Sequence, residues 1–378
     1  MSKYLYDITY IYGQGRKEKL ESEDFTFSKE FFYGYPYFKE KNYKLNIVEA
    51  KTQDFKKIRY RLLKEIDKFL SKITKLTFYS NMLITRKNLY IMFNSRNLIT
   101  SNHGNGNSLS LIVLILKTFK KINFITIVSG LFNLQKTNFL IRFFRFIFLK
   151  IYLYTVNFIV FTNRSEYELA SKYFHSYKKK FICLPFCIDE NYWKSSSDYN
   201  PSTRNQILFI GNNGHRDFQL ALDIAKNLPE YNFKFITNKI FPNQINSQNV
   251  VLVKGDWNYI YLTDDEIKEE YNKSKIVIMP LKNSIVSAGQ SVGLQAAAMG
   301  VPLVISDTIG FWDRAKYTDA KNIVFVKENN LETWIKVIVD LYQNDEKLNT
   351  ISRNSILLVK EFYNLDNFNY ELEKLIKK

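Results

Sequence analysis

The sequence contains few of the residues that support secreted folds or metal sites. Among 378 residues there are only two cysteines, Cys183 and Cys187, and three histidines. Two cysteines in a chain of this length do not form the disulfide framework of a secreted protein, and no cluster of cysteine and histidine completes a zinc site. We therefore expect reduced thiols, a cytoplasmic location and no bound metal.

Long apolar runs are also missing. The first residues, MSKYLYDITYIYG, are charged and polar where a signal peptide requires an apolar run. The longest apolar stretch, Leu109 to Leu116, is far shorter than the ~20 residues of a spanning helix. The sequence therefore predicts neither a signal peptide nor a transmembrane helix.

Positive charge, in contrast, is abundant. Lysine and arginine number 54 against 37 aspartates and glutamates, which gives a formal net charge of +17. Such a charge favours phosphorylated small molecules, anionic membranes or nucleic acid as partners. A general bias toward Lys, Asn, Ile, Phe and Tyr also contributes to it. No nucleic-acid-binding motif accompanies the charge, so we expect no nucleic-acid partner.

Strand-like and helical segments alternate along both halves of the chain. The first half opens with a strand over residues 4–12, and the second with a strand over residues 207–210. Each strand runs into glycine, and the polar segment 194–202 separates the two halves. This alternation predicts parallel sheets in an α/β fold, with two Rossmann-like domains and a cleft between them. We expect domains at 1–193 and 194–360, and a C-terminal helix over 361–378 that returns to the first domain.

One helix of the second half has the sequence of an anion site. A run of small residues follows a strand that ends at Pro280, and Gly289 opens the helix. Free N–H groups of a first helical turn, together with the helix dipole, attract anions. We expect a diphosphate at Gly289, Gln290 and Ser291, and ribose hydroxyls within reach of Gln295. The alternative is an ordinary helix of a doubly wound sheet with nothing bound.

This helix resembles part of the second domain of the group-1 GT-B glycosyltransferases, which include glycogen synthase-like and lipid mannosyltransferase-like enzymes. The family pattern is an acid, seven residues, and an acid followed by Ala, with Gly-x-Pro and a strand after it. Gln295-Ala296 and Gly300-Val301-Pro302 fit that pattern. The resemblance implies the GT-B fold and a nucleotide-sugar donor.

Two further segments support the resemblance. Residues 184–193 look like the interdomain segment of the family, with a proline, a hydrophobic-Asp pair and an aromatic residue. Gly211 followed by Arg216 looks like its glycine turn with a downstream cation. Such a cation neutralises the departing diphosphate, because breaking a sugar–phosphate bond leaves charge on the phosphate. Arg216 could instead pair with Asp217 or Asp223, and Lys282 is a weaker second cation.

The chain departs from the family at both acids of the pair, which are Ser287 and Gln295 here. Glutamine can still hydrogen-bond a ribose, although less strongly than a carboxylate, and serine cannot replace a carboxylate near the sugar. The retaining or inverting outcome is therefore not carried over. A catalytically silent GT-B module, binding a glycan or a partner at the membrane, is the alternative reading.

The first half offers one candidate catalytic residue, His103. We expect it in a loop over residues 102–107, at the carboxyl end of a strand, with a helix from Ser108. In the family, a histidine of a comparable loop approaches the donor sugar, where it can bond a hydroxyl or act as a base. A loop histidine facing water is the alternative. Gly13 and Gly15 could let the backbone approach the donor, or simply close a strand–helix corner.

The segment from Asn138 to Tyr154 predicts a helix that is apolar around most of its circumference. Arg142, Arg145 and Lys150 fall within one arc of it. Basic residues flanking aromatic ones suit a helix lying on anionic lipid, and several GT-B enzymes dock on membranes through the first domain. The alternative is a buried helix whose basic side chains extend to solvent.

Together these features predict a glycosyltransferase that moves a sugar from a nucleotide-diphosphate donor to a glycan or glycolipid of the cell envelope. Residues 194–360 would bind the donor and residues 1–193 the acceptor, without a metal, since no Asp-x-Asp motif stands out. The protein would lie in the cytoplasm, peripherally on the inner face of the membrane. Nucleotide-sugar 2-epimerases share the architecture, but they need more acids and histidines in the cleft.

Overall fold

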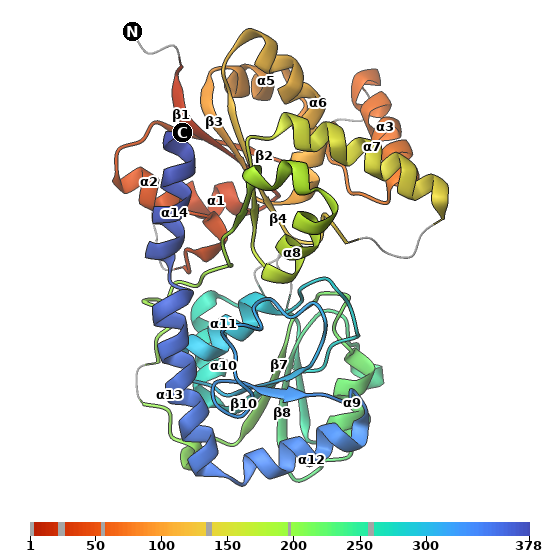
Figure 1. Cartoon of the computed structure of the whole chain (residues 1–378). Coiled ribbons are helices and arrows are strands. Elements are labelled where there is room, and N and C mark those ends of the chain that lie inside the picture. Colours follow the sequence, from red (N-terminus) through yellow and green to blue (C-terminus); the bar gives the residue numbers. More distant parts are fainter. Residues whose placement is uncertain (1–3, 22–26, 54–56, 134–137, 196–197, 256–260) are drawn as a thin grey trace. The chain divides into compact units, whose positions relative to one another are not determined.

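The computed structural model describes residues 4–21, 27–53, 57–133, 138–195, 198–255 and 261–378. The chain divides into two compact units (Figure 1). Unit 1 comprises Met1–Phe25, Phe32–Leu184 and Asn369–Lys378, and unit 2 comprises Thr26–Phe31 and Pro185–Phe368. The chain therefore passes into unit 2 for six residues near its start, and back into unit 1 near its end.

Each unit is built on a parallel six-stranded sheet. In unit 1 the strand order is β2-β1-β3-β4-β5-β6. Its strands are β1 (Tyr6–Tyr12), β2 (Leu45–Glu49), β3 (Ser95–Thr100), β4 (Asn123–Val128), β5 (Phe158–Phe161) and β6 (Phe181–Cys183). In unit 2 the order is β12-β11-β10-β7-β8-β9. Its strands are β7 (Gln206–Ile210), β8 (Asn232–Ile236), β9 (Val250–Val253), β10 (Ser274–Met279), β11 (Leu303–Ser306) and β12 (Val324–Val326). All paired strands are parallel, as the alternation of strands and helices predicts.

Helices connect the strands, as parallel pairing requires. In unit 1 they are α1 (Arg16–Glu21), α2 (Tyr35–Glu40), α3 (Ile58–Thr74), α4 (Ser80–Leu83), α5 (Arg86–Phe93), α6 (His103–Phe119), α7 (Phe139–Thr155) and α8 (Arg164–Tyr173). In unit 2 they are α9 (Phe218–Lys226), α10 (Asp264–Lys273), α11 (Gln290–Ala298), α12 (Leu331–Tyr342) and α13 (Asp345–Phe362). The last helix, α14 (Leu365–Lys377), begins in unit 2 and ends in unit 1. The division expected after residue 193, and the separate segment 361–378, stay predictions.

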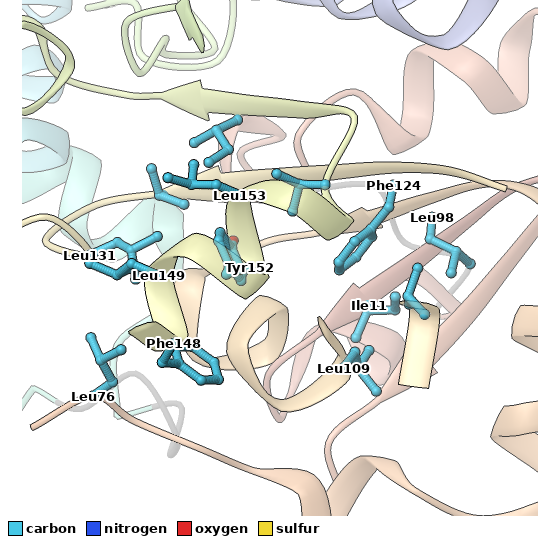
Figure 2. Close-up of a cluster of buried hydrophobic side chains, with 14 of the residues drawn as sticks. Ile11, Leu76, Leu98, Leu109, Phe124, Leu131, Phe148, Leu149, Tyr152 and Leu153 are labelled. Atoms are coloured by element: carbon cyan, nitrogen blue, oxygen red, sulfur yellow. The ribbon is translucent and has the colours of Figure 1, made fainter. Parts of the chain in front are cut away.

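An apolar cluster in the core of unit 1 includes one face of α7. Figure 2 shows Phe148, Leu149, Tyr152 and Leu153 of that helix among side chains of the sheet such as Phe124. These four residues recur at helical spacing, so one face of α7 is buried. The core of unit 2 is a second cluster, centred on the strands and on Trp334 of α12.

The end of α14 is attached to unit 1 through Glu373. Its carboxylate accepts hydrogen bonds from Tyr37 Oη at 2.7 Å and Tyr43 Oη at 3.0 Å, and it pairs with Lys41 Nζ at 2.8 Å. These donors lower the pKa of Glu373 well below its usual range. The last ten residues are therefore an integral part of unit 1.

The loop expected at residues 102–107 is wrong, because α6 already begins at His103. The side chain of Asn102 caps the helix by accepting a hydrogen bond from the N–H of Asn105 at 2.9 Å. Glycine stands at positions 104 and 106 of the helix because a larger residue would not fit there. A Cβ added to Gly104 would come 2.6 Å from the ring of Tyr79, and one added to Gly106 would come 2.7 Å from Tyr152 Oη. The glycines of this segment serve close packing rather than a turn.

Candidate functional site

The turn after β7 places the side chain of Arg216 against the backbone of Gly211, the glycine that opens the same turn. Gly211 has a φ of +131°, and a Cβ there would come 2.8 Å from Nε and Nη2 of Arg216. The arginine is 2% exposed. The next residue, Asp217, caps α9 by accepting from the N–H of Leu220 at 3.2 Å. Glycine is needed here because the guanidinium occupies the space of a side chain.

Arg216 is a buried cation without a counter-ion in the described part of the chain. Its alternative partners are engaged elsewhere, since Asp217 caps a helix and Asp223 accepts from Gln219 Nε2 at 2.9 Å. Its Nε and Nη1 atoms have no hydrogen-bond partner among the described residues. Burial lowers the pKa of Arg216 to about 10, so the guanidinium is still charged at neutral pH. An unpaired buried charge is strongly unfavourable, and an anionic ligand would compensate it.

The guanidinium lies at the N-terminus of α11. Gly289 is the N-cap residue with a φ of +81°, and no side chain caps the helix. A Cβ on Gly289 would come 2.6 Å from Nη1 of Arg216 and would also overlap Met279. The positive end of the helix dipole and a fixed cation therefore converge at one point. This arrangement within unit 2 favours an anionic ligand.

Other residues predicted to bind the nucleotide-sugar lie near Gly289 in the sequence, and they differ in burial and in hydrogen bonding. The Oγ atom of Ser287 is buried and has no hydrogen-bond partner among the described residues, so it is a further free polar group before α11. Lys282 is exposed, and its N–H donates to the carbonyl of His215 at 2.9 Å. Gln290 and Ser291 form the first turn of α11.

Gln295 is held by protein atoms at both ends of its amide. Its Nε2 donates to Glu30 Oε1 at 3.3 Å, and its Oε1 lies 3.2 Å from Tyr271 Oη. Tyr271 Oη also lies 3.3 Å from the carbonyl of Val292. The amide of Gln295 therefore already has two polar neighbours within the protein. The role expected for Gln295 at a ribose stays a prediction.

Glu30 is a site residue that the sequence analysis missed. It stands in an aromatic stretch, SKEFFYGYPYF, without any motif around it, and only the tertiary structure brings it to α11. Burial raises the pKa of its carboxyl to about 7. No sequence signal could have identified this position, because the contact joins residues 265 positions apart.

The predicted glycine turn of unit 1 differs from the site at Gly289. The N–H groups of Arg16 and Lys17, in the first turn of α1, both donate to Glu49 Oε1 at 2.8 Å. A carboxylate of the protein therefore occupies the place that an anionic ligand would take. Gly15 has a φ of +86° with nothing within 4 Å of an added Cβ, and Gly13 has only Arg16 nearby at 3.7 Å.

His103 is the first residue of α6 in unit 1. Burial lowers its pKa, a hydrogen bond with the backbone of Ser129 opposes this effect, and the positive charge of Arg145 adds to it. The imidazole is therefore neutral at pH 7 and can accept a proton. Its function stays a prediction.

The three basic residues predicted to share an arc of α7 differ in exposure. Arg145 is buried and donates from Nη2 to the carbonyl of Leu131 at 2.7 Å, whereas Arg142 and Lys150 are exposed. Arg145 therefore stabilises the core side of the helix. The outer side is apolar, and its large exposed residues are Phe139, Leu140, Phe143, Phe144, Phe146, Ile147 and Tyr154.

The described residues contain no group of three histidine, cysteine, aspartate or glutamate side chains arranged to hold a metal ion. Within the same residues, every helix is too short or too polar to cross a lipid bilayer.

Known structures provide the comparison for the fold, since no family model and no characterised protein match the sequence. Anabaena Alr3699/HepE in complex with UDP-glucose superposes with a TM-score of 0.67 at 10% identity, over 98% of this chain and 99% of that one. Sucrose-phosphate synthase from Thermosynechococcus elongatus gives 0.68 at 11%, over 98% of both chains. A glycosyltransferase from Rickettsia africae gives 0.67 at 12%, over 100% and 98%. Their common architecture confirms the fold expected from the sequence resemblance: this chain has the two-unit α/β fold of GT-B glycosyltransferases.

Proposed function

We propose that the protein is a glycosyltransferase that transfers a sugar from a nucleotide-diphosphate donor. The observation that carries the proposal is Arg216, a buried guanidinium at the N-terminus of α11 whose Nε and Nη1 have no hydrogen-bond partner among the described residues. A diphosphate supplies the negative charge that this site lacks. The similar Anabaena protein has been seen with UDP and with UDP-glucose, which supports a nucleotide-sugar as the ligand here.

The chemistry follows from where charge develops. When an acceptor hydroxyl attacks the anomeric carbon, the bond from that carbon to the phosphate oxygen breaks, and negative charge accumulates on the diphosphate. Arg216 and the N–H groups at Gly289, Gln290 and Ser291 would stabilise this charge without a metal ion. His103, neutral at pH 7, would bond a sugar hydroxyl or take the acceptor's proton.

A thermal-shift screen of the purified protein against UDP, GDP, ADP and TDP and their glucose conjugates tests the proposal. Binding of a ligand to the native state raises the unfolding temperature in proportion to the logarithm of its concentration over its Kd. We expect one nucleotide to produce the largest rise in the unfolding temperature. We also expect the protein to transfer the sugar of the matching conjugate to an added acceptor. A flat response to all of them would contradict the proposal.

For the acceptor, we propose a glycan or glycolipid of the cell envelope, reached at an anionic membrane surface through α7. The supporting observation is the apolar outer side of α7 beside the exposed side chains of Arg142 and Lys150. The neighbouring α3 adds Ile58 and Phe69, which are 82% and 61% exposed (Figure 1). Exposed apolar residues next to basic ones favour the interface of an anionic bilayer.

A second candidate function is a catalytically silent module that binds a glycan or a partner at the membrane. Two observations favour it: Ser287 stands in place of an acid, and the amide of Gln295 is engaged by Glu30 and Tyr271. Both functions allow nucleotide binding, so sugar transfer is the measurement that separates them.

A further inference from the structure

Glu30 is a buried carboxyl group of unit 2 that the proposed chemistry does not use. Residues Thr26–Phe31 belong to that unit, where the N–H of Ser28 donates to Asp264 Oδ2 at 3.0 Å. The N–H of Lys29 donates to Asp189 Oδ2 at 3.2 Å. These bonds fix the segment and present Glu30, 2% exposed, to the interior.

The two carboxyl oxygens of Glu30 have different surroundings. Oε1 accepts from Trp193 Nε1 at 2.9 Å and from Gln295 Nε2 at 3.3 Å. Oε2 is buried and has no hydrogen-bond partner among the described residues. A buried carboxylate with an unpartnered oxygen is unfavourable, whereas a neutral carboxylic acid in the same place is less so.

A chain of contacts joins Glu30 to the anion site. Gln295 stands on α11, the helix that begins at Gly289, and it contacts Tyr271. The ring of Tyr271 packs edge-on against that of Trp193 at 5.9 Å between centroids. Charge on Glu30 and on Arg216 both affect the pKa of Tyr271, in opposite directions, so the three groups share one electrostatic environment.

Among the described residues, no cation is among the causes that shift the pKa of Glu30, and Arg216 acts on the neighbouring Tyr271. The titratable groups that act on it, or on which it acts, are Asp189, Tyr192 and Tyr271, and none of these side chains can carry a positive charge. Burial raises the pKa of Glu30 most and the charge of Asp189 raises it further, whereas hydrogen bonds from its own backbone, from Trp193 and from Gln295 oppose the shift. With a pKa of about 7, both protonation states are populated at neutral pH.

We propose that Glu30 is a proton-coupled positioning residue of the nucleotide site: it holds Gln295 on α11, and it takes up a proton from solvent when a diphosphate binds beside Arg216. The proposal rests on the proposed function, because it assumes that the anion at Arg216 is a nucleotide diphosphate. The physical reason is that a second negative charge in a shared low-dielectric interior disfavours the carboxylate. Affinity for the donor is then full below pH 7 and falls as the pH rises above it.

Isothermal titration with UDP-glucose in buffers of different ionisation enthalpy measures this proton uptake. UDP-glucose is the right probe because its diphosphate has no group that titrates near pH 7, unlike a terminal phosphate, whose pKa is about 6. At pH 7.5 we expect the native protein to take up roughly half a proton or more per ligand, and Glu30→Gln to take up none. Between pH 7 and 8.5 the Kd of the native protein should rise by up to about tenfold per pH unit, and that of Glu30→Gln should stay flat.

Two variants serve as controls. Glu166→Gln replaces another buried carboxyl with a raised pKa, which lies in unit 1, and should leave the proton uptake unchanged. His215→Gln removes the titratable group next to Arg216 in the chain. This variant should also keep most of the proton uptake. Equal uptake by the native protein and Glu30→Gln, or loss of uptake in His215→Gln alone, would overturn the inference while the proposed function stands.

The native protein alone also decides the matter if Glu30→Gln does not fold. A Kd for UDP-glucose that is constant between pH 6.5 and 8.5, with no uptake, would overturn the role of Glu30. Failure of the native protein to bind any of the UDP, GDP, ADP and TDP conjugates of glucose would instead overturn the proposed function, and the inference with it.

Discussion

Nη1 of Arg216 lies 2.6 Å from the position that a Cβ on Gly289 would occupy. The contact joins the turn after β7 to the start of α11, two segments more than seventy positions apart in the sequence. Because Nε and Nη1 of Arg216 have no hydrogen-bond partner among the described residues and no side chain caps α11, a cation and a helix dipole meet at one point.

Replacing Gly289 by alanine should disrupt this contact. The new methyl group would overlap Met279 and Arg216, and a φ of +81° is strained for alanine. We expect a loss of about 1–3 kcal/mol in the free energy of unfolding and a clear loss of UDP binding. Gly214→Ala is the matched control, since no atom lies within 4 Å of the added Cβ and its φ is not in the left-handed region. Chemical denaturation and titration with UDP measure both effects, and equal behaviour of the two variants would contradict the role of Gly289.

Arg216→Met should separate binding from stability. Methionine fills much of the same volume without a buried unpaired charge, so the unfolding free energy should stay the same or rise. UDP affinity should fall about 10- to 100-fold, because charge-assisted hydrogen bonds to the diphosphate are lost. Lys282→Met, at an exposed cation, should change affinity much less. Unchanged affinity in Arg216→Met would remove the diphosphate from this place.

Glu30→Gln should change how stability depends on pH. The pKa of Glu30 in the folded protein is about 7, above the value of about 4.3 for an unfolded chain. As the pH rises, the carboxyl therefore ionises in the unfolded state at a lower pH than in the folded state. The native protein should therefore lose roughly 2–4 kcal/mol of unfolding free energy between pH 4.5 and 7 through this group. The variant should lack that loss. Urea denaturation at several pH values measures it, and parallel curves for both proteins would show that Glu30 does not titrate as proposed.

The outer side of α7 should determine binding to lipid vesicles. We expect the native protein to sediment with vesicles rich in anionic lipid, and Arg142→Glu/Lys150→Glu to remain in the supernatant, because charge attraction is replaced by repulsion. Phe139→Ser/Phe143→Ser should also weaken binding, since both rings are exposed. Tyr90→Ser, at an exposed ring of α5, is the control. Sedimentation that is equal for all four proteins would exclude α7 as the lipid surface.

Arg145 shows why charge spacing alone did not predict which basic residues are exposed. Arg142, Arg145 and Lys150 share an arc of the helix by angle, yet Arg145 is buried against the carbonyl of Leu131 while the other two are exposed. The partner carbonyl belongs to a separate segment, so the helix sequence contains no information about it. The same reason explains the loop expected at residues 102–107, whose glycines pack against Tyr79 and Tyr152.

By itself, the sequence determined the two parallel sheets and the helix that begins at Gly289. Alternation of apolar strands with amphipathic helices, and glycine where a strand ends, are local properties that a chain expresses through its own spacing. Only the tertiary structure decided that Arg216 has no counter-ion within the described ranges, that Glu30 reaches Gln295, and that Arg145 faces inward. Burial and pairing depend on which distant segments pack together, and the free energy of a buried charge depends on the neighbours that this packing supplies.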